Sequence, residues 1–168
     1  MKPSAAPMKN DWFSNPYLRD AVAESPIGLA IVKLEDRRNA ITVSFFSEVA
    51  HYPTAMWISV SKDSYTHPLL RRAGRFSFIT LSHEQSGIAI ACGTASGRAQ
   101  DKCSALDLYD NGDGFLFLKD ALASTACRIA SEIDVGDHTL FIGHMLSGDV
   151  STRSRNLRQL LLSDLRKA

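Results

Sequence analysis

The sequence predicts a mainly β, α+β fold: a closed antiparallel β-barrel with short helices and a C-terminal amphipathic helix. About seven short segments carry the alternating or β-branched pattern of strands, and the segments with helical spacing between them are short. Strands and helices do not alternate regularly, as a doubly wound parallel sheet would require. No Gly-x-Gly-x-x-Gly sequence follows the first predicted strand, which argues against a Rossmann nucleotide site.

The sequence predicts a boundary between an N-terminal leader and the barrel domain. Residues 1–14 begin with a stretch rich in Pro, Ala and Ser, and we expect a mobile leader there. Residues 15–168 are expected to form a single domain. A short helix is expected over residues 17–24, and it should end near Pro26.

Three strands and a helix are predicted next. The strands cover residues 27–34, 40–49 and 55–61, where apolar residues run together or alternate with hydroxyl side chains. Helical spacing of apolar residues predicts a helix over residues 65–73, and Gly74 is suited to end it.

The middle of the chain predicts a strand over residues 76–81 and helices over residues 84–92 and 100–106. The turn-forming run at residues 110–114 then precedes a strand over residues 115–118. A calcium loop is rejected here, because Tyr109 would occupy the first ligand position and Asp120 the last.

Two long strands and a helix complete the prediction. Residues 123–133 alternate between two faces, and a further strand runs from His138 to about residue 146. From about Arg153, an amphipathic helix is predicted whose leucines form one stripe: Leu157, Leu160, Leu161 and Leu165.

The composition is that of an ordinary globular domain of 168 residues, with 45% hydrophobic and 22% charged residues. A formal net charge of +1 gives no general attraction for nucleic acid or an anionic membrane surface. Three cysteines without metal-ligand spacing indicate a reducing compartment. No signal peptide and no apolar run near the ~20 residues of a membrane span is visible, so we expect a cytoplasmic protein.

Residues 59–66 place several hydroxyls and one lysine where a strand ends and a helix begins. Free amides at a helix start, together with hydroxyls and an ammonium group, satisfy a phosphate monoester. The alternative is simple helix capping by Ser64 or Thr66, with Lys62 in solvent.

Two further segments have the residue types of a ligand site. In residues 39–44, small residues allow a flat ring to approach the backbone, and Thr42 and Ser44 share one face; a half-solvated strand is the alternative. Residues 96–102 form a turn that brings Arg98 and Lys102 to the start of a predicted helix. Cations there oppose the helix dipole, so they either meet an anionic partner or are exposed.

The Gly136-Asp137 turn directs His138 to the mouth of the following strand, where small-molecule sites are often built. Surface turns also carry histidines without a function, so this signal gains weight only beside the segments above.

In this order, the segments resemble the flavin reductase-like family, whose members bind FMN in a split β-barrel. The resemblance covers about residues 27–146. It is carried by five short motifs: Asn-Ala-x-Thr-x-Ser at 39–44, the Ser/Lys/Ser/Thr segment at 59–66, Ala-Gly-Arg-Phe at 73–76, Ser-Gly-x-x-x-Asp-Lys at 96–102 and Gly-Asp-His-Thr at 136–139.

The resemblance implies where FMN binds: residues 40–44 would line the ring, and residues 59–66 would hold the ribityl chain and phosphate. Arg98 and Lys102 would lie near the pyrimidine end or the phosphate. His138 would bind the nicotinamide dinucleotide. The cofactor-binding residues implied in this way are Asn39, Ala40, Ile41, Thr42, Ser44, Ser59, Val60, Ser61, Lys62, Ser64, Thr66, Arg98 and Lys102.

The resemblance implies an NAD(P)H:flavin oxidoreductase that forms a homodimer with the flavin near its interface. FMN is favoured over FAD, and a monooxygenase is a candidate partner. Hydride transfer needs a stacked nicotinamide and donors near the flavin N1 and C2 carbonyl, but no general acid, which agrees with the lack of a catalytic triad or carboxylate pair. No catalytic residue and no metal ligand is assigned. The alternatives are an FMN electron-transfer protein without nicotinamide activity, and a split-barrel module for another flat ligand such as haem.

Overall fold

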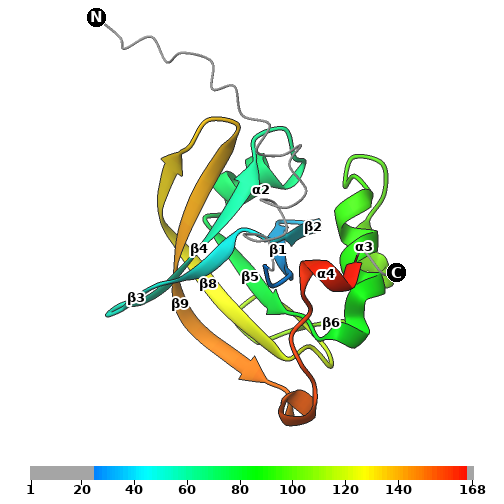
Figure 1. Cartoon of the computed structure of the whole chain (residues 1–168). Coiled ribbons are helices and arrows are strands. Elements are labelled where there is room, and N and C mark those ends of the chain that lie inside the picture. The colour runs from blue at the N-terminus through cyan, green and yellow to red at the C-terminus, as the bar shows by residue number, and fades with distance from the viewer. Residues whose placement is uncertain (1–24, 166–168) are drawn as a thin grey trace, which may run out of the picture.

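The computed structural model describes residues 25–165 (Figure 1). The predicted leader and the helix predicted over residues 17–24 lie outside the described residues. Within residues 25–165, no helix is both long and apolar enough to cross a membrane.

A seven-stranded antiparallel sheet dominates the fold, in the order β2-β1-β5-β8-β9-β4-β3. Its strands are β1 (Gly28–Leu34), β2 (Arg37–Val43), β3 (Phe46–His51), β4 (Thr54–Ser61), β5 (Arg75–Thr80), β8 (Ala123–Asp134) and β9 (His138–Val150). The predicted mainly antiparallel fold is confirmed. The barrel is not closed, however, because β2 and β3 remain as the two edges of the sheet.

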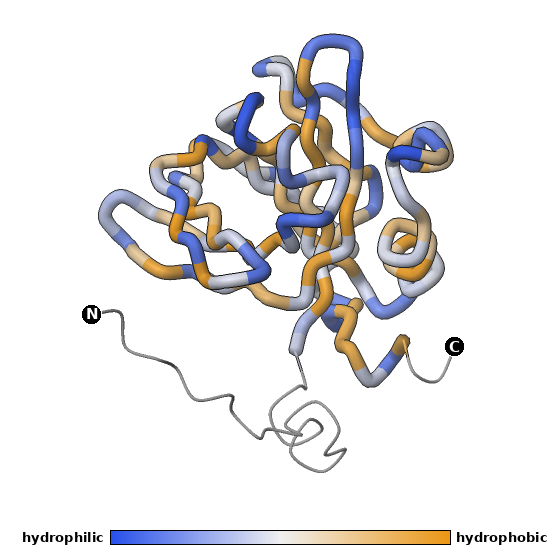
Figure 2. The backbone as a smooth tube through the Cα atoms, turned by 90° about the horizontal axis from the view of Figure 1, so that it is seen from above, coloured by the Kyte–Doolittle hydropathy of each residue, from blue (hydrophilic) through white to orange (hydrophobic). Residues whose placement is uncertain are grey.

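The central strand β1 shows how the sheet is buried on both faces. Its residues Leu29 and Ile31 belong to one core cluster, together with Ile79, Leu160 and residues of helix α3 (Ser86–Thr94). The alternate residues Ala30 and Val32 point to a second cluster that includes Phe76, Phe78 and Phe141. Because successive strand residues face opposite sides, one apolar strand supplies both cores. In Figure 2, hydrophobic residues are concentrated toward the middle of the molecule, and several outer turns are hydrophilic.

The strand predicted over residues 40–49 is wrong in one respect, because the structure divides it into β2 and β3. Ser44 and Phe45 form a bend between them. The bend is needed because β2 pairs with β1 and β3 pairs with β4, so the chain must pass from one edge of the sheet to the other. The carbonyl of Phe45 accepts the amide of Ser59 at 2.9 Å, which fixes the bend against β4.

The two longer helices are confirmed, as α2 (Thr66–Ala73) and α3 (Ser86–Thr94), the latter preceded by a 3-10 turn over His83–Gln85. Gly74 ends α2 with φ +63° and donates its amide to the Leu70 carbonyl. The helix predicted over residues 100–106 is only a 3-10 turn, Lys102–Ala105, which Asp101 caps through the amide of Cys103. β6 (Leu108–Asp110) and β7 (Leu116–Leu118) form a separate hairpin.

The long C-terminal amphipathic helix is wrong for the described residues. The chain forms a 3-10 helix over Thr152–Asn156, then runs extended, and only Leu162–Leu165 is helical (α4). The extended part is held by backbone pairing, because Leu160 donates to the Leu81 carbonyl and accepts the amide of Ile27. Leu160 is therefore fully buried in the core, and α4 lies beside α3 (Figure 1).

Candidate functional site

A pocket of about 290 Å³ lies between the edge strand β2, the start of α2 and the loop that follows α3. Three segments that are distant in the sequence meet there, as the family resemblance implies. The predicted site residues that line the pocket are Asn39, Ile41, Ser64, Thr66, Arg98 and Lys102.

Asn39 is the buried polar centre of this pocket, with an exposed fraction of 1%. Its side-chain amide donates to the Thr66 hydroxyl at 2.7 Å, but its Oδ1 has no hydrogen-bond partner among the described residues. A buried acceptor without a partner destabilises the fold by about 1–3 kcal/mol. A ligand with an N–H or O–H group directed at Oδ1 would remove this cost.

The loop after α3 approaches Asn39 so closely that only glycine fits at residue 97. A Cβ on Gly97 would lie 2.3 Å from Asn39 Oδ1 and 2.5 Å from Cδ1 of Tyr65. The backbone of this loop therefore forms one wall of the pocket, a use of glycine that the Ser96-Gly97 pair in the sequence could have indicated.

The start of α2 offers several groups to an anion. The amides of Tyr65 and Thr66 have no assigned acceptor among the described residues, and they stand at the positive end of the helix. The Ser64 hydroxyl accepts the amide of His67 at 3.1 Å and retains its own proton. Above them, the Arg98 guanidinium lies 6.0 Å from the Tyr65 ring and donates to the Asp63 carbonyl. These groups suit a phosphate.

Two predicted donors are already used by the protein. Lys102 is 8% exposed and donates to the carbonyls of Cys92 and Ala95 at 2.8 and 3.1 Å, so it caps the C-terminus of α3. Burial lowers the pKa of Lys102. Thr42 gives its hydroxyl proton to the Ala89 carbonyl at 2.6 Å. Both residues fix α3 against β2, and Lys102 keeps one N–H at the pocket wall.

The other predicted cofactor residues do not line this pocket. Lys62 is exposed and forms a 2.6 Å ion pair with Asp134, and the Ser61 hydroxyl accepts the amide of Asp63. Ala40 and Val60 are core residues. Ser44 and Ser59 are half-buried near the bend after β2.

His138 lies at the start of β9, directly opposite Ser61 of β4. Its Nδ1 is 2.8 Å from the Asp137 carboxylate, and this hydrogen bond holds the pKa of Asp137 below its usual range. Its ring meets Phe45 edge to face, with centroids 6.4 Å apart. The segment from Ser59 to Ser64 therefore connects His138 to the pocket. Phe45 and Tyr65 were not predicted as site residues, although both directly adjoin predicted ones.

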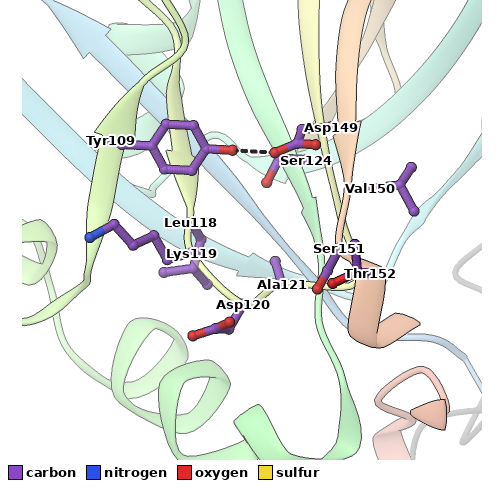
Figure 3. Close-up of a pocket in the computed structure, with 10 residues that line it drawn as sticks. All are labelled: Tyr109, Leu118, Lys119, Asp120, Ala121, Ser124, Asp149, Val150, Ser151 and Thr152. Atoms are coloured by element: carbon purple, nitrogen blue, oxygen red, sulfur yellow. Dashed lines mark hydrogen bonds between the residues drawn. The ribbon is translucent and has the colours of Figure 1, made fainter. Parts of the chain in front are cut away.

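A larger pocket of about 500 Å³ lies between the β6–β7 hairpin and the far end of the β8–β9 ribbon (Figure 3). None of the predicted site residues lines it. Its Tyr109 hydroxyl donates to Asp149 at 2.6 Å, and burial together with this carboxylate raises the pKa of Tyr109 to about 12. The Tyr109 hydroxyl and the Asp149 carboxylate are thus hydrogen-bonded to each other, whereas Oδ1 of Asn39 in the smaller pocket has no hydrogen-bond partner among the described residues. Residues 25–165 contain no group of three side chains suited to bind a metal ion.

Comparison with known proteins identifies the family that the chain resembles. The family model described as "Flavin reductase like domain" matches residues 14–166. An FMN reductase (NADH), SmoA, of Agrobacterium fabrum is 32% identical over 130 residues, which are 76% of this chain and 72% of the relative. The reductase component of an FADH(2)-dependent resorcinol hydroxylase from a Rhizobium species is 29% identical, over 73% of this chain and 68% of that protein.

A solved structure shows the same fold. The NADH:FAD oxidoreductase SgcE6 of Streptomyces globisporus superposes with a TM-score of 0.80 and covers 96% of both chains at 20% sequence identity.

Proposed function

Because the chain belongs to the family of flavin reductase like domains, we propose that it is an NAD(P)H-dependent flavin reductase that binds FMN beside Asn39. The observation that carries this proposal is the buried, unpartnered Oδ1 of Asn39, in a pocket that also presents an anion site at the start of α2. A molecule with ring N–H groups and a phosphate satisfies both features. FMN is such a molecule.

In this proposal, Asn39 accepts a hydrogen bond from the flavin ring, and the amides of Tyr65 and Thr66, with Ser64 and Arg98, hold the phosphate. β2 is an edge strand, so one row of its backbone groups is not used by the sheet, and residues 40–44 can offer it to the ring. Ser59, Ser61 and Lys62 would hold the ribityl chain or the phosphate. Lys62 must then leave its ion pair with Asp134 and bind the cofactor instead.

Bound FMN would supply the hydride acceptor, its N5, and a ring that becomes negative near N1 and the C2 carbonyl. The N–H of Lys102 that does not bond to the Cys92 or Ala95 carbonyl, together with backbone amides of the pocket wall, would be the donors available to such a charge. His138 would orient the nicotinamide, with Asp137 fixing its ring. Either NADH or NADPH is accommodated by this proposal, although NADH is the nucleotide named for the Agrobacterium fabrum relative.

The test is the spectrum of the purified protein with FMN. We expect a yellow complex that is bleached when NADH or NADPH is added without oxygen. A yellow protein that is indifferent to both nucleotides would support the alternative, an electron-transfer flavoprotein. A colourless protein that does not take up FMN, or a haem spectrum, would contradict FMN binding altogether. FAD is tested in parallel, and tighter binding of FAD would overturn the choice of FMN.

Three further proposals accompany this function. We propose a single domain over residues 15–168, supported by the extent of the family match, and a reducing, cytoplasmic location, supported by three buried free cysteines. We propose a homodimer with the flavin near its interface, supported by exposed apolar side chains of β3, β8 and β9: Val49, Ile133 and Leu146. A monooxygenase that receives reduced flavin is proposed because a relative is named as such a reductase component.

A further inference from the structure

We propose that Phe45 is the stacking surface for the nicotinamide ring, with His138 at the edge of that ring. This inference rests on the proposed function. Phe45 directly follows the predicted cofactor strand, and 51% of this aromatic residue is exposed. The inference gives this exposed ring a role in nucleotide specificity.

The geometry of the two rings carries the proposal. The Phe45 and His138 rings have centroids 6.4 Å apart and planes inclined by 68°. Because the two planes are inclined and half of Phe45 is exposed, a flat ring stacked on Phe45 would meet the imidazole at an angle and would not lie parallel to it. Nδ1 of His138 is hydrogen-bonded to the Asp137 carboxylate, and no partner is assigned to Nε2 within residues 25–165. A planar ring with a carboxamide on its edge is the ligand that such a corner fits.

The corner is held by backbone contacts and does not depend on the two side chains alone. The Phe45 carbonyl accepts the Ser59 amide at 2.9 Å, and the Asp137 carbonyl accepts the Lys62 amide at 2.9 Å. Both residues are thus attached to the end of β4, and His138 also pairs with Ser61. Because the next residues, Asp63 and Ser64, line the Asn39 pocket, a dinucleotide at this corner is next to the proposed flavin.

The stacking surface should favour the oxidised nucleotide. In the reaction, dihydronicotinamide gives up a hydride (two electrons and one proton) and becomes a pyridinium cation, while the flavin is reduced by the same two electrons. The face of a phenyl ring carries negative potential and attracts a cation. Replacement of Phe45 by an aliphatic residue should therefore weaken the binding of NAD⁺ more than the binding of NADH.

The experiment compares Phe45→Leu and Phe45→Trp with Tyr52→Leu, the same aromatic-to-leucine change at a residue that is 99% exposed on the β3–β4 turn. FMN affinity is measured by flavin fluorescence, and the KM for NADH and product inhibition by NAD⁺ by steady-state kinetics. For Phe45→Leu we expect a KM for NADH raised roughly threefold, an inhibition constant of NAD⁺ raised up to about tenfold, and unchanged FMN affinity. Phe45→Trp should restore both constants, and Tyr52→Leu should change neither.

Unchanged nicotinamide constants in Phe45→Leu would overturn the inference, as would a loss of FMN affinity equal to the rise in KM. The proposed function fails in a different way, when the unaltered protein does not bind FMN or, with FMN bound, oxidises neither NADH nor NADPH.

Discussion

The side-chain amide of Asn39 donates a 2.7 Å hydrogen bond to the hydroxyl of Thr66, and this bond joins the edge strand β2 to the first turn of α2. Both residues are 1% exposed. The bond leaves Oδ1 of Asn39 as a buried acceptor without a partner among the described residues, and the proposed position of the flavin rests on this acceptor.

Thr66→Val should lower the free energy of unfolding by about 1–3 kcal/mol, because it leaves the Asn39 amide buried without an acceptor. FMN affinity should fall with it, since Asn39 is then free to turn. Thr66→Ser keeps the hydroxyl and is the matched control. Urea denaturation measures the first effect and fluorescence titration the second. A valine variant as stable as the serine variant would show that the bond has no energetic importance.

Gly97→Ala should weaken FMN binding at least about tenfold, or ~1.4 kcal/mol. The added Cβ would lie 2.3 Å from Asn39 Oδ1, and Asn39 cannot move away without breaking its bond to Thr66. Gly87→Ala is the control, because a Cβ there meets no atom within 4 Å and alanine favours helix α3. Equal FMN affinity in the two variants would contradict the position of the flavin beside Gly97.

Asp134→Asn should raise FMN affinity about two- to fivefold and leave riboflavin affinity unchanged, because it releases Lys62 to the phosphate. Lys62 lowers the pKa of Asp134, so their ion pair is formed at any pH above the ordinary pKa of aspartate. It is lost only as the pH falls through the lower pKa of the folded state. Glu132→Gln, which breaks the neighbouring pair with Arg71, is the control. A parallel gain for riboflavin would exclude a phosphate contact of Lys62.

Local patterns predicted most of the strands, since β1, β4, β5 and β8 are continuous apolar or alternating segments. The resemblance to the flavin reductase-like family, and not a local pattern, implied that residues 39–41, 64–66 and 98–102 meet at one site. Local patterns did not predict the bend at Phe45 or the extended chain around Leu160, because backbone pairing with distant strands decides both. The capping of α3 by Lys102 could not be predicted for a similar reason. Nothing in the sequence shows that the last carbonyls of α3 lie within hydrogen-bond distance of its ammonium group.

Tyr109→Phe should make the unfolding free energy less dependent on alkaline pH. The raised pKa of about 12 for Tyr109 means that the folded state favours the neutral phenol. The corresponding stability is fully present below the ordinary pKa of 10 and is lost as the pH rises through about 12. Asp149→Asn keeps the phenol and should lower its pKa. Absorbance titration of phenolate measures this, and a spectrum in which Tyr109 ionises near 10 would contradict the bond to Asp149.

His138→Ala should raise the KM for the nicotinamide nucleotide roughly tenfold while FMN affinity stays nearly unchanged. The reason is the position of His138, which lies opposite Ser61 and is oriented by Asp137, outside the pocket that Asn39 and Thr66 form. Because Nδ1 donates to Asp137, Nε2 of a neutral His138 ring is the acceptor for the nicotinamide carboxamide. Such a hydrogen bond is worth about 0.5–1.5 kcal/mol, and the loss of the ring contact adds to it. His138→Gln retains an acceptor and should recover part of the affinity, which separates hydrogen bonding from packing. Steady-state kinetics with saturating FMN give the KM, and fluorescence titration gives the FMN dissociation constant. An equal loss of both affinities would place His138 in the flavin site itself, and the assignment to the nicotinamide would be wrong.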